Sequence, residues 1–229
     1  VDRRQRQMCI RDSVTAGLST PSSTRALADA LSQAVCSQVG ARGEGVETTM
    51  IELRELATEL SEAMTNWGST TPRLDEAKRA LSTASALIAV TPIFQGSYSG
   101  LFKLFFDTLD PHALEHLPTA IAATGGSSRH ALVLDYALRP LFNYLHATVI
   151  PTGVFQATED FGTAEGTRNA QRIERAAKEL ADLIVAPTDR VAGLAAPNLA
   201  EPSPRPTGLD VEEEFTPFSA LLKGHDGTA

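Results

Sequence analysis

The sequence predicts an α/β protein, a three-layer α/β/α sandwich built on a five-stranded parallel β-sheet. Short apolar stretches of strand length alternate with longer stretches whose apolar residues recur at helical spacing. The stretch Ala86–Val90 is apolar at every position, as expected for a strand that is covered on both faces. With 229 residues, the chain is long enough for one such domain and a shorter appendage.

In the first half of the chain, apolar side chains every three or four positions predict helices, and β-branched or continuously apolar stretches predict strands. A first buried strand is expected just before Ala16, where a polar loop leads into a helical pattern. The following elements are a helix at 24–39, a strand at 46–53, helices at 56–64 and 74–84, and the strand at 86–90. Gly68 and Pro72 separate the two successive helices.

The second half continues the alternation with a helix at 100–108, strands at 119–123 and 149–155, and helices at 129–146 and 169–185. Pro140 is expected to kink or divide its helix, because proline lacks an N–H and its ring clashes with the preceding turn. Right-handed crossovers between parallel strands place all their carboxyl ends at one edge of the sheet, where ligands bind in such folds. The loops after the strands are therefore the informative ones.

Both ends of the chain differ from this core. The segment Val1–Ser13 is rich in arginine, and a buried strand, which should be a run of Val, Ile and Leu, would find only Met8 and Ile10 there, with Val14 just after it. It resembles translated adapter sequence, so we expect a non-native leader; a genuine basic leader is the alternative. Residues 14–186 are expected to form the domain. Residues 187–229 are rich in proline, and we expect a flexible, dispensable tail that ends in a short docking segment around Phe215.

Charge and composition exclude several classes of function. A net charge of -8 argues against a nucleic-acid surface. No apolar run approaches the roughly 20 residues of a membrane span, and no secretory signal is expected. Cys9 and Cys36 have neither zinc nor redox spacing, which favours free thiols in a cytoplasmic protein. His112 and His116 lie four residues apart, but a metal site would need a third ligand, so none is expected.

The first candidate loop, residues 16–25, gathers hydroxyl groups directly before a helix. The hydroxyl-bearing residues are Ser19, Thr20, Ser22, Ser23 and Thr24, and the cation Arg25 follows them. A helix start offers free N–H groups and a partial positive charge, so the cluster favours a phosphate site. Simple N-capping is the alternative, because serine and threonine are common at that position.

Two further loops favour a flat ligand. Residues 91–100 follow the most buried strand and offer aromatic surface and hydrogen-bonding groups that suit a heteroaromatic ring. The candidate binding residues there are Thr91, Pro92, Ile93, Phe94, Gln95 and Ser97. In residues 123–130, two glycines permit a close backbone approach to a ligand, and the candidates are Thr124, Gly125, Gly126 and Ser127. Either loop alone is compatible with a structural turn, but three such loops at one edge favour a binding site.

These segments resemble a known family. T-P-I-F-Q-G-S-Y-S-G-L-F-K (91–103) is similar to the block T-P-V-Y-x-x-S-Y-S-G-x-L-K of the NAD(P)H-dependent FMN reductases. A-T-G-G-S-S-R-H-A-L-V-L-D-Y-A-L-R-P (123–140) is similar to their block A-T-G-G-x-x-x-H-x-L-x-x-D-Y-A-L-x-P. The resemblance covers roughly residues 16–185. It implies a flavodoxin-like sheet with FMN at the strand ends, the phosphate in the first loop, and the ribityl chain and ring between the other two.

The resemblance also implies an oxidoreductase that transfers hydride from NADPH or NADH to N5 of FMN and supplies reduced flavin to a flavin-dependent monooxygenase. No catalytic side chain is required, since the cofactor carries the chemistry. Leu18 and Gln95 depart from the serine and lysine of many relatives. Tyr136 matches a position in a distorted helix at a subunit interface, which implies a homodimer or tetramer. The alternatives are an FMN-dependent quinone or azo reductase and a flavodoxin-like electron carrier.

Overall fold

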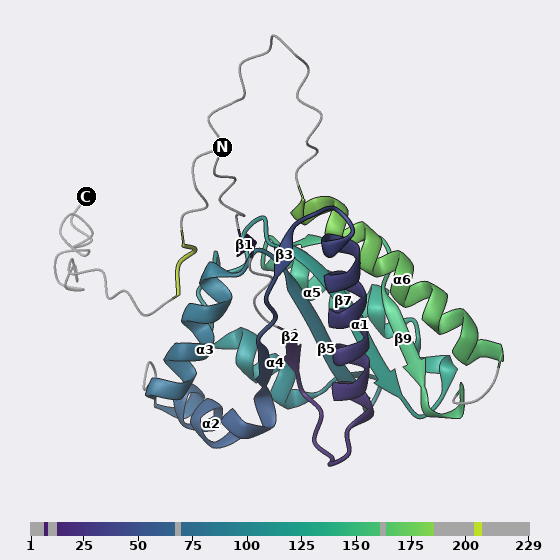
Figure 1. Cartoon of the computed structure of the whole chain (residues 1–229). Coiled ribbons are helices and arrows are strands. Elements are labelled where there is room, and N and C mark those ends of the chain that lie inside the picture. Colours follow the sequence, from purple (N-terminus) through teal and green to yellow (C-terminus); the bar gives the residue numbers. More distant parts are fainter. Residues whose placement is uncertain (1–6, 9–12, 67–69, 161–163, 186–203, 208–229) are drawn as a thin grey trace, which may run out of the picture.

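The computed structural model describes residues 7–8, 13–66, 70–160, 164–185 and 204–207 (Figure 1). The strands are β1 (Gln7–Met8), β2 (Ser13–Thr15), β3 (Gly45–Val46), β4 (Met50–Glu52), β5 (Leu87–Phe94), β6 (Ser97–Tyr98), β7 (Pro118–Gly125), β8 (Thr148–Val149) and β9 (Val154–Ala157). The α-helices are α1 (Ser23–Gly40), α2 (Ala57–Thr65), α3 (Pro72–Thr83), α4 (Gly100–Asp107), α5 (Arg139–Tyr144) and α6 (Ala164–Ile184). Short 3-10 helices span Leu53–Leu56, Ser128–His130 and Thr158–Asp160, and a π-helix spans Leu134–Leu138.

The main sheet confirms the predicted flavodoxin-like order. Its strands run β4-β2-β5-β7, all parallel, and β8 and β9 both pair in parallel with β7 as two segments of the fifth strand. The prediction of continuous strands at 46–53 and 149–155 is wrong. β3 pairs with β1 outside the main sheet, and Pro151, which has no N–H for a ladder, lies in the gap between β8 and β9.

Helices cover both faces of the sheet, as the alternation predicted (Figure 1). Along β5, Leu87 and Ala89 face a core shared with α2 to α5, whereas Ile88 and Val90 face a core shared with α1 and α6. All four side chains are fully buried, which explains why the sequence of β5 is apolar without alternation.

The helix expected at 129–146 is divided, as Pro140 predicted. A 3-10 turn is followed by the π-helix, in which the N–H of Arg139 donates to the carbonyl of Leu134, and α5 begins only at Arg139. A regular α-helix cannot pass through this point, because proline cannot donate to the fourth preceding carbonyl and its ring crowds that group. The π-turn widens the helix there instead.

Three charged side chains hold the connection 150–153 between β8 and β9. The guanidinium of Arg139 donates to the carbonyls of residues 150 and 151, both at 3.0 Å. Glu179 of α6 accepts from the N–H of Thr152 at 2.8 Å and from its hydroxyl at 2.7 Å. Arg172 donates to the carbonyl of residue 153 at 2.6 Å. These contacts satisfy backbone groups of the gap that do not pair with β7, whereas the N–H of residue 150 donates to the carbonyl of Thr119 in β7 at 3.0 Å.

The expected leader lies mostly outside the described residues. Within it, β1 pairs with β3, and Ser13 is already the first, buried residue of β2. No helix in the described part of the chain is long and apolar enough to cross a membrane.

Replacing Phe106 by alanine tests the core that β5 shares with α2 to α5. Its ring centroid lies 4.7 Å from that of Phe102 and 5.0 Å from that of Phe142, and the side chain is buried. The truncation leaves a cavity, so we expect Phe106→Ala to lower the free energy of unfolding by about 3–5 kcal/mol, measured by urea denaturation. Leu183→Ala, at a half-exposed position of α6, is the control and should cost far less.

Candidate functional site

The three candidate loops meet at the carboxyl edge of the sheet, as predicted. The N–H of Ala16 donates to the carbonyl of Val90 at 3.2 Å, which ties the first loop to β5. Pro92 lies beside Thr124 in the register of β5 and β7. The hydroxyls of Thr24 and Thr124 share a buried hydrogen bond of 2.8 Å, which joins the first loop to the third. The site is therefore held together by direct contacts between segments up to 100 residues apart.

The first loop presents unused hydrogen-bond donors at the start of α1. Ser22 is the N-cap, and its hydroxyl oxygen accepts from the N–H of Arg25 at 3.1 Å, so the capping role holds for this residue. Within the described residues, the backbone N–H groups of Ser23 and Thr24 and the hydroxyls of Ser19 and Ser23 have no acceptor. Exposed donors at a helix start bind anions, so this set fits a phosphate group.

Gly17 allows the loop to curl this tightly. A Cβ at that position would lie 2.1 Å from the Ser22 hydroxyl oxygen, closer than any side chain tolerates. The N–H of Gly17 donates to the Thr15 hydroxyl at 3.4 Å, which fixes where the chain leaves β2.

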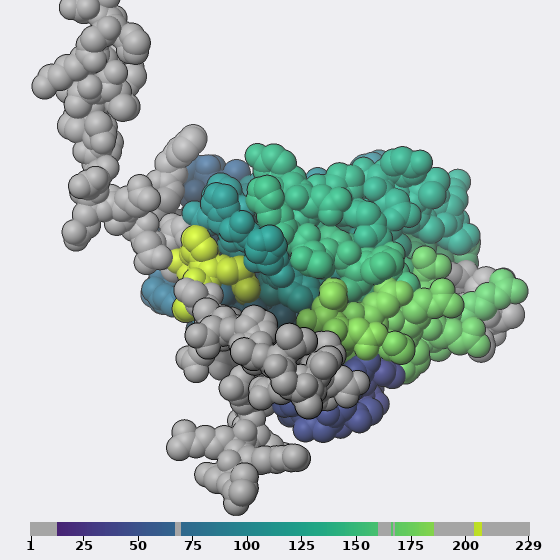
Figure 2. All heavy atoms as spheres, turned by 90° about the horizontal axis from the view of Figure 1, so that it is seen from above, coloured from purple at the N-terminus to yellow at the C-terminus, as the bar shows by residue number. Residues whose placement is uncertain are grey.

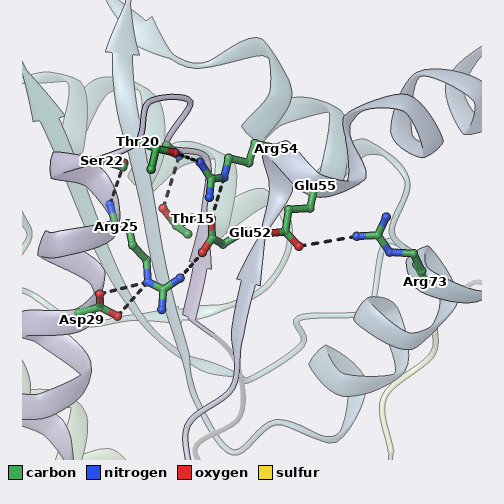
Figure 3. Close-up of polar contacts among 10 residues, drawn as sticks. Thr15, Thr20, Ser22, Arg25, Asp29, Glu52, Arg54, Glu55 and Arg73 are labelled. Atoms are coloured by element: carbon green, nitrogen blue, oxygen red, sulfur yellow. Dashed lines mark hydrogen bonds and ion pairs between the residues drawn. The ribbon is translucent and has the colours of Figure 1, made fainter.

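Two arginines flank the first loop, and carboxylates balance both (Figure 3). The Nε of Arg25 donates to Asp29 at 2.9 Å and its Nη1 pairs with Glu52, so its side chain points along α1 and away from the loop. The hydrogen bond with Asp29 raises the pKa of Arg25. Arg54 pairs with Glu52 at 2.8 Å and donates to the Thr20 hydroxyl. The helix start, rather than Arg25, thus supplies the unbalanced positive potential.

The second loop forms a hairpin that projects an aromatic ring. Gln95 (φ 50°) and Gly96 (φ 80°) form the two-residue turn between β5 and β6, and both adopt the left-handed region. Thr91 is buried and accepts from the N–H of Ser99 at 3.1 Å, which anchors the base of the hairpin. Phe94, next to the turn at the tip of the hairpin, has a 48% exposed side chain. Pro92, Ile93 and Ser97 lie between the buried base and this tip, and they are half-buried.

The third loop is fixed from β9. A Cβ on Gly125 would lie 2.9 Å from the Phe155 ring, so glycine is required there by a neighbouring side chain, while Gly126 faces open space. Glu159 accepts from the N–H of Ser128 at 2.7 Å. This hydrogen bond, with further ones from the Ser127 and Ser128 hydroxyls, lowers the pKa of Glu159.

Sequence reasoning missed Arg54 and Glu159. Arg54 lies just after the carboxyl end of β4, and Glu159 lies just after that of β9. This position in the sequence is the signal by which they could have been found. The two histidines set aside as metal ligands are in a different region. His112 lies 3.5 Å from Glu115 and stacks on His146, and no group of three metal-binding side chains occurs among the described residues.

Comparisons with known proteins give a consistent result. The family model described as NADPH-dependent FMN reductase matches residues 13–162. The NADH-dependent FMN reductase SfnE of Pseudomonas putida is 40% identical over 143 residues, 62% of this chain and 73% of that protein. An FMN reductase (NADPH) of Pseudomonas aeruginosa is 36% identical over 148 residues, 65% of this chain and 76% of that protein. The X-ray structure of an oxidoreductase from Corynebacterium diphtheriae is 56% identical with a TM-score of 0.74, covering 77% of this chain and 97% of that one.

The hydrogen bonds between the Glu159 carboxylate and the third loop should be lost when the carboxylate is protonated at low pH. Hydrogen bonds to the ionised carboxylate lower its pKa, so their stabilisation is present above the unfolded value of about 4.3 and is lost as pH falls through the lower folded value. We expect the amide NMR signal of Ser128 to report this step below pH 4.3. In Glu159→Gln the step should disappear; a step that persists would assign it to another group.

Proposed function

The chain belongs to the NADPH-dependent FMN reductase family, and from this premise we propose that its three converging loops are the FMN site. The protein is an oxidoreductase that uses NAD(P)H to reduce FMN. The observation that carries the assignment of the site is the set of unused donors at the start of α1, joined through Thr24 and Thr124 to the loop at the end of β7.

In this proposal the first loop binds the phosphate. The protein is net acidic, so a dianionic phosphate needs local positive potential. The start of α1 contributes up to about 2 kcal/mol through its dipole in a partly buried geometry. Each hydrogen bond from Ser19, Ser22, Ser23 or Thr24 to the charged oxygens contributes about 1.5–3 kcal/mol. Arg25 and Arg54 hold the surrounding loop through Glu52 and Thr20 rather than meeting the phosphate directly.

The second and third loops bind the ribityl chain and the ring. The exposed ring of Phe94 and the half-buried Pro92 and Ile93 supply an apolar wall, and Gln95 and Ser97 supply polar edges. The loop Thr124–Ser127 lies opposite, with Gly126 open to close backbone approach. When bound, FMN would supply the hydride-accepting chemistry, and the part of this chain would be to hold the ring and to stabilise its developing charge with N–H groups.

We further propose that the reduced flavin is passed to a separate flavin-dependent monooxygenase, on the strength of the sequence resemblance. A cytoplasmic location is proposed from the cysteine usage; of the two cysteines, Cys36 lies in the described part and is a free thiol. A homodimer or tetramer is proposed from the surface around the π-helix. Leu132 is 63% exposed, and Tyr136 and Tyr144 are each 79% exposed. Large apolar side chains gathered on one helical segment are typical of an interface.

A turnover assay with limiting protein, NADPH or NADH, and excess free FMN tests the function. We expect many equivalents of FMN to be reduced per protein molecule, followed as loss of flavin absorbance under anaerobic conditions. Turnover only on addition of a quinone or azo dye would instead assign a quinone or azo reductase. A single equivalent with no turnover would assign an electron carrier.

Ser23→Asp tests the phosphate site. The substitution removes a donor and places a like charge beside the phosphate, so we expect FMN affinity to fall by two or more orders of magnitude, about 2.8 kcal/mol, measured by fluorescence titration. Riboflavin lacks the phosphate, so its weaker affinity should hardly change.

Ser37→Asp is the matched control, because Ser37 is exposed near the other end of the same helix. It should leave both affinities unchanged. Equal losses for FMN and riboflavin in Ser23→Asp would contradict the phosphate assignment.

Tyr136→Asp tests the proposed interface. A carboxylate at this position would be buried without a partner on association, so we expect the variant to elute as a monomer of about 24 kDa by light scattering. Met64→Asp, at a 43% exposed position on α2, is the control and should keep the wild-type mass. A monomeric wild type at micromolar concentration would refute the interface.

A further inference from the structure

A short segment of the proline-rich tail lies against the domain. The described residues 204–207 run beside α3 (Figure 1), and the view from above shows them packed on the surface of the domain (Figure 2). The N–H of Arg205 donates to the carbonyl of Ser82 at 3.1 Å. Its guanidinium donates to the carbonyls of Leu81 at 2.9 Å, Ala84 at 2.6 Å and Ala113 at 3.1 Å. One side chain thus meets three backbone acceptors.

The carboxyl end of α3 is a favourable site for such a cation. The last carbonyls of an α-helix have no intrahelical donor, and they carry the negative end of the helix dipole. No basic residue lies in the last turn of α3, and the chain continues from Ala84 almost directly into the buried first half of β5. Arg205 supplies the missing cation from a position 121 residues further along the chain.

The same side chain joins two connections of the fold. Leu81 and Ala84 lie where α3 passes into β5, and Ala113 lies in the connection between α4 and β7. Both connections reach the amino ends of central strands, at the edge opposite the three flavin loops. A planar guanidinium with five donors can bridge several carbonyls in fixed directions, which a lysine cannot do.

The flanking prolines suit this role. Pro204 and Pro206 restrict the backbone on either side of Arg205 before it binds, so less conformational entropy is lost on docking. A Pro-Arg-Pro segment is therefore suited to act as a preformed ligand.

We propose that Pro204–Thr207 is an intramolecular ligand of the domain, held in a site made by the carbonyls of Leu81, Ala84 and Ala113. The ligand class is an extended peptide with a central arginine, and its occupant is this chain's own tail. The folded unit then includes residues 204–207, beyond the end of α6.

Arg205→Ala in the full chain tests the proposal by a readout that involves no flavin. We expect the melting temperature to fall by about 4–8 °C, because several charge-assisted hydrogen bonds are lost in a chain of this size. Hydrogen exchange should accelerate at the amides of residues 83–87 and 113–117, while α6 keeps its protection. Arg205→Lys keeps the charge without the planar guanidinium, so its melting temperature should lie between those of the wild type and Arg205→Ala.

Arg79→Ala is the matched control, since Arg79 belongs to the same helix, is 64% exposed and makes one long ion pair of 4.0 Å. It should shift the melting temperature by less than about 1 °C. The proposal is overturned if Arg205→Ala melts and exchanges like the wild type, or if exchange rises equally in α6.

Discussion

The parallel pairing of β2 between β4 and β5 is the interaction on which the rest of the structure depends. β2 spans only Ser13–Thr15, yet in the described sheet it is the strand that connects β4 to the others. The hydroxyls of Ser13 and Ser32 lie 2.6 Å apart and fix α1 above it. A slip of one residue would reverse the face of every side chain of β2 and move the first loop away from Thr124. The position of the hydrogen-bond donors at the start of α1 is therefore set by the pairing of three residues.

The sequence predicted the fold well because its strongest patterns are those of burial. The apolar β5, the loops at strand ends and the effect of Pro140 all follow from local chemistry, and the structure confirms them. The three candidate loops do converge at one edge, as parallel strands require. The interruption of the strand at 46–53 was missed because β propensity does not reveal which strand will lie alongside. The interruption at 149–155 coincides with Pro151, a signal that the sequence carries but that the prediction did not use.

The features that sequence reasoning missed share one property: each is a side chain that makes a hydrogen bond with a distant part of the chain. Arg54 donates to the Thr20 hydroxyl, Glu159 accepts from a backbone N–H 31 residues away, and Arg205 donates to a carbonyl 121 residues away. No periodicity encodes such a contact. Arg25 shows the converse, since its place next to the hydroxyl cluster suggested a phosphate ligand, while two carboxylates engage its side chain. At this loop the positive potential therefore comes from the backbone N–H groups at the start of α1.

The hydrogen bond between Thr24 and Thr124 bears on how long a bound molecule stays. It joins two walls of the proposed site through the chain's own side chains, so the fold itself sets their spacing. When a site is assembled beforehand, differences in affinity among related ligands are expressed mainly in the rate of departure rather than of arrival. In the proposed function, in which the reduced flavin leaves for another protein, the residence time is then set by the few donors at the start of α1, and the backbone that carries them need not change.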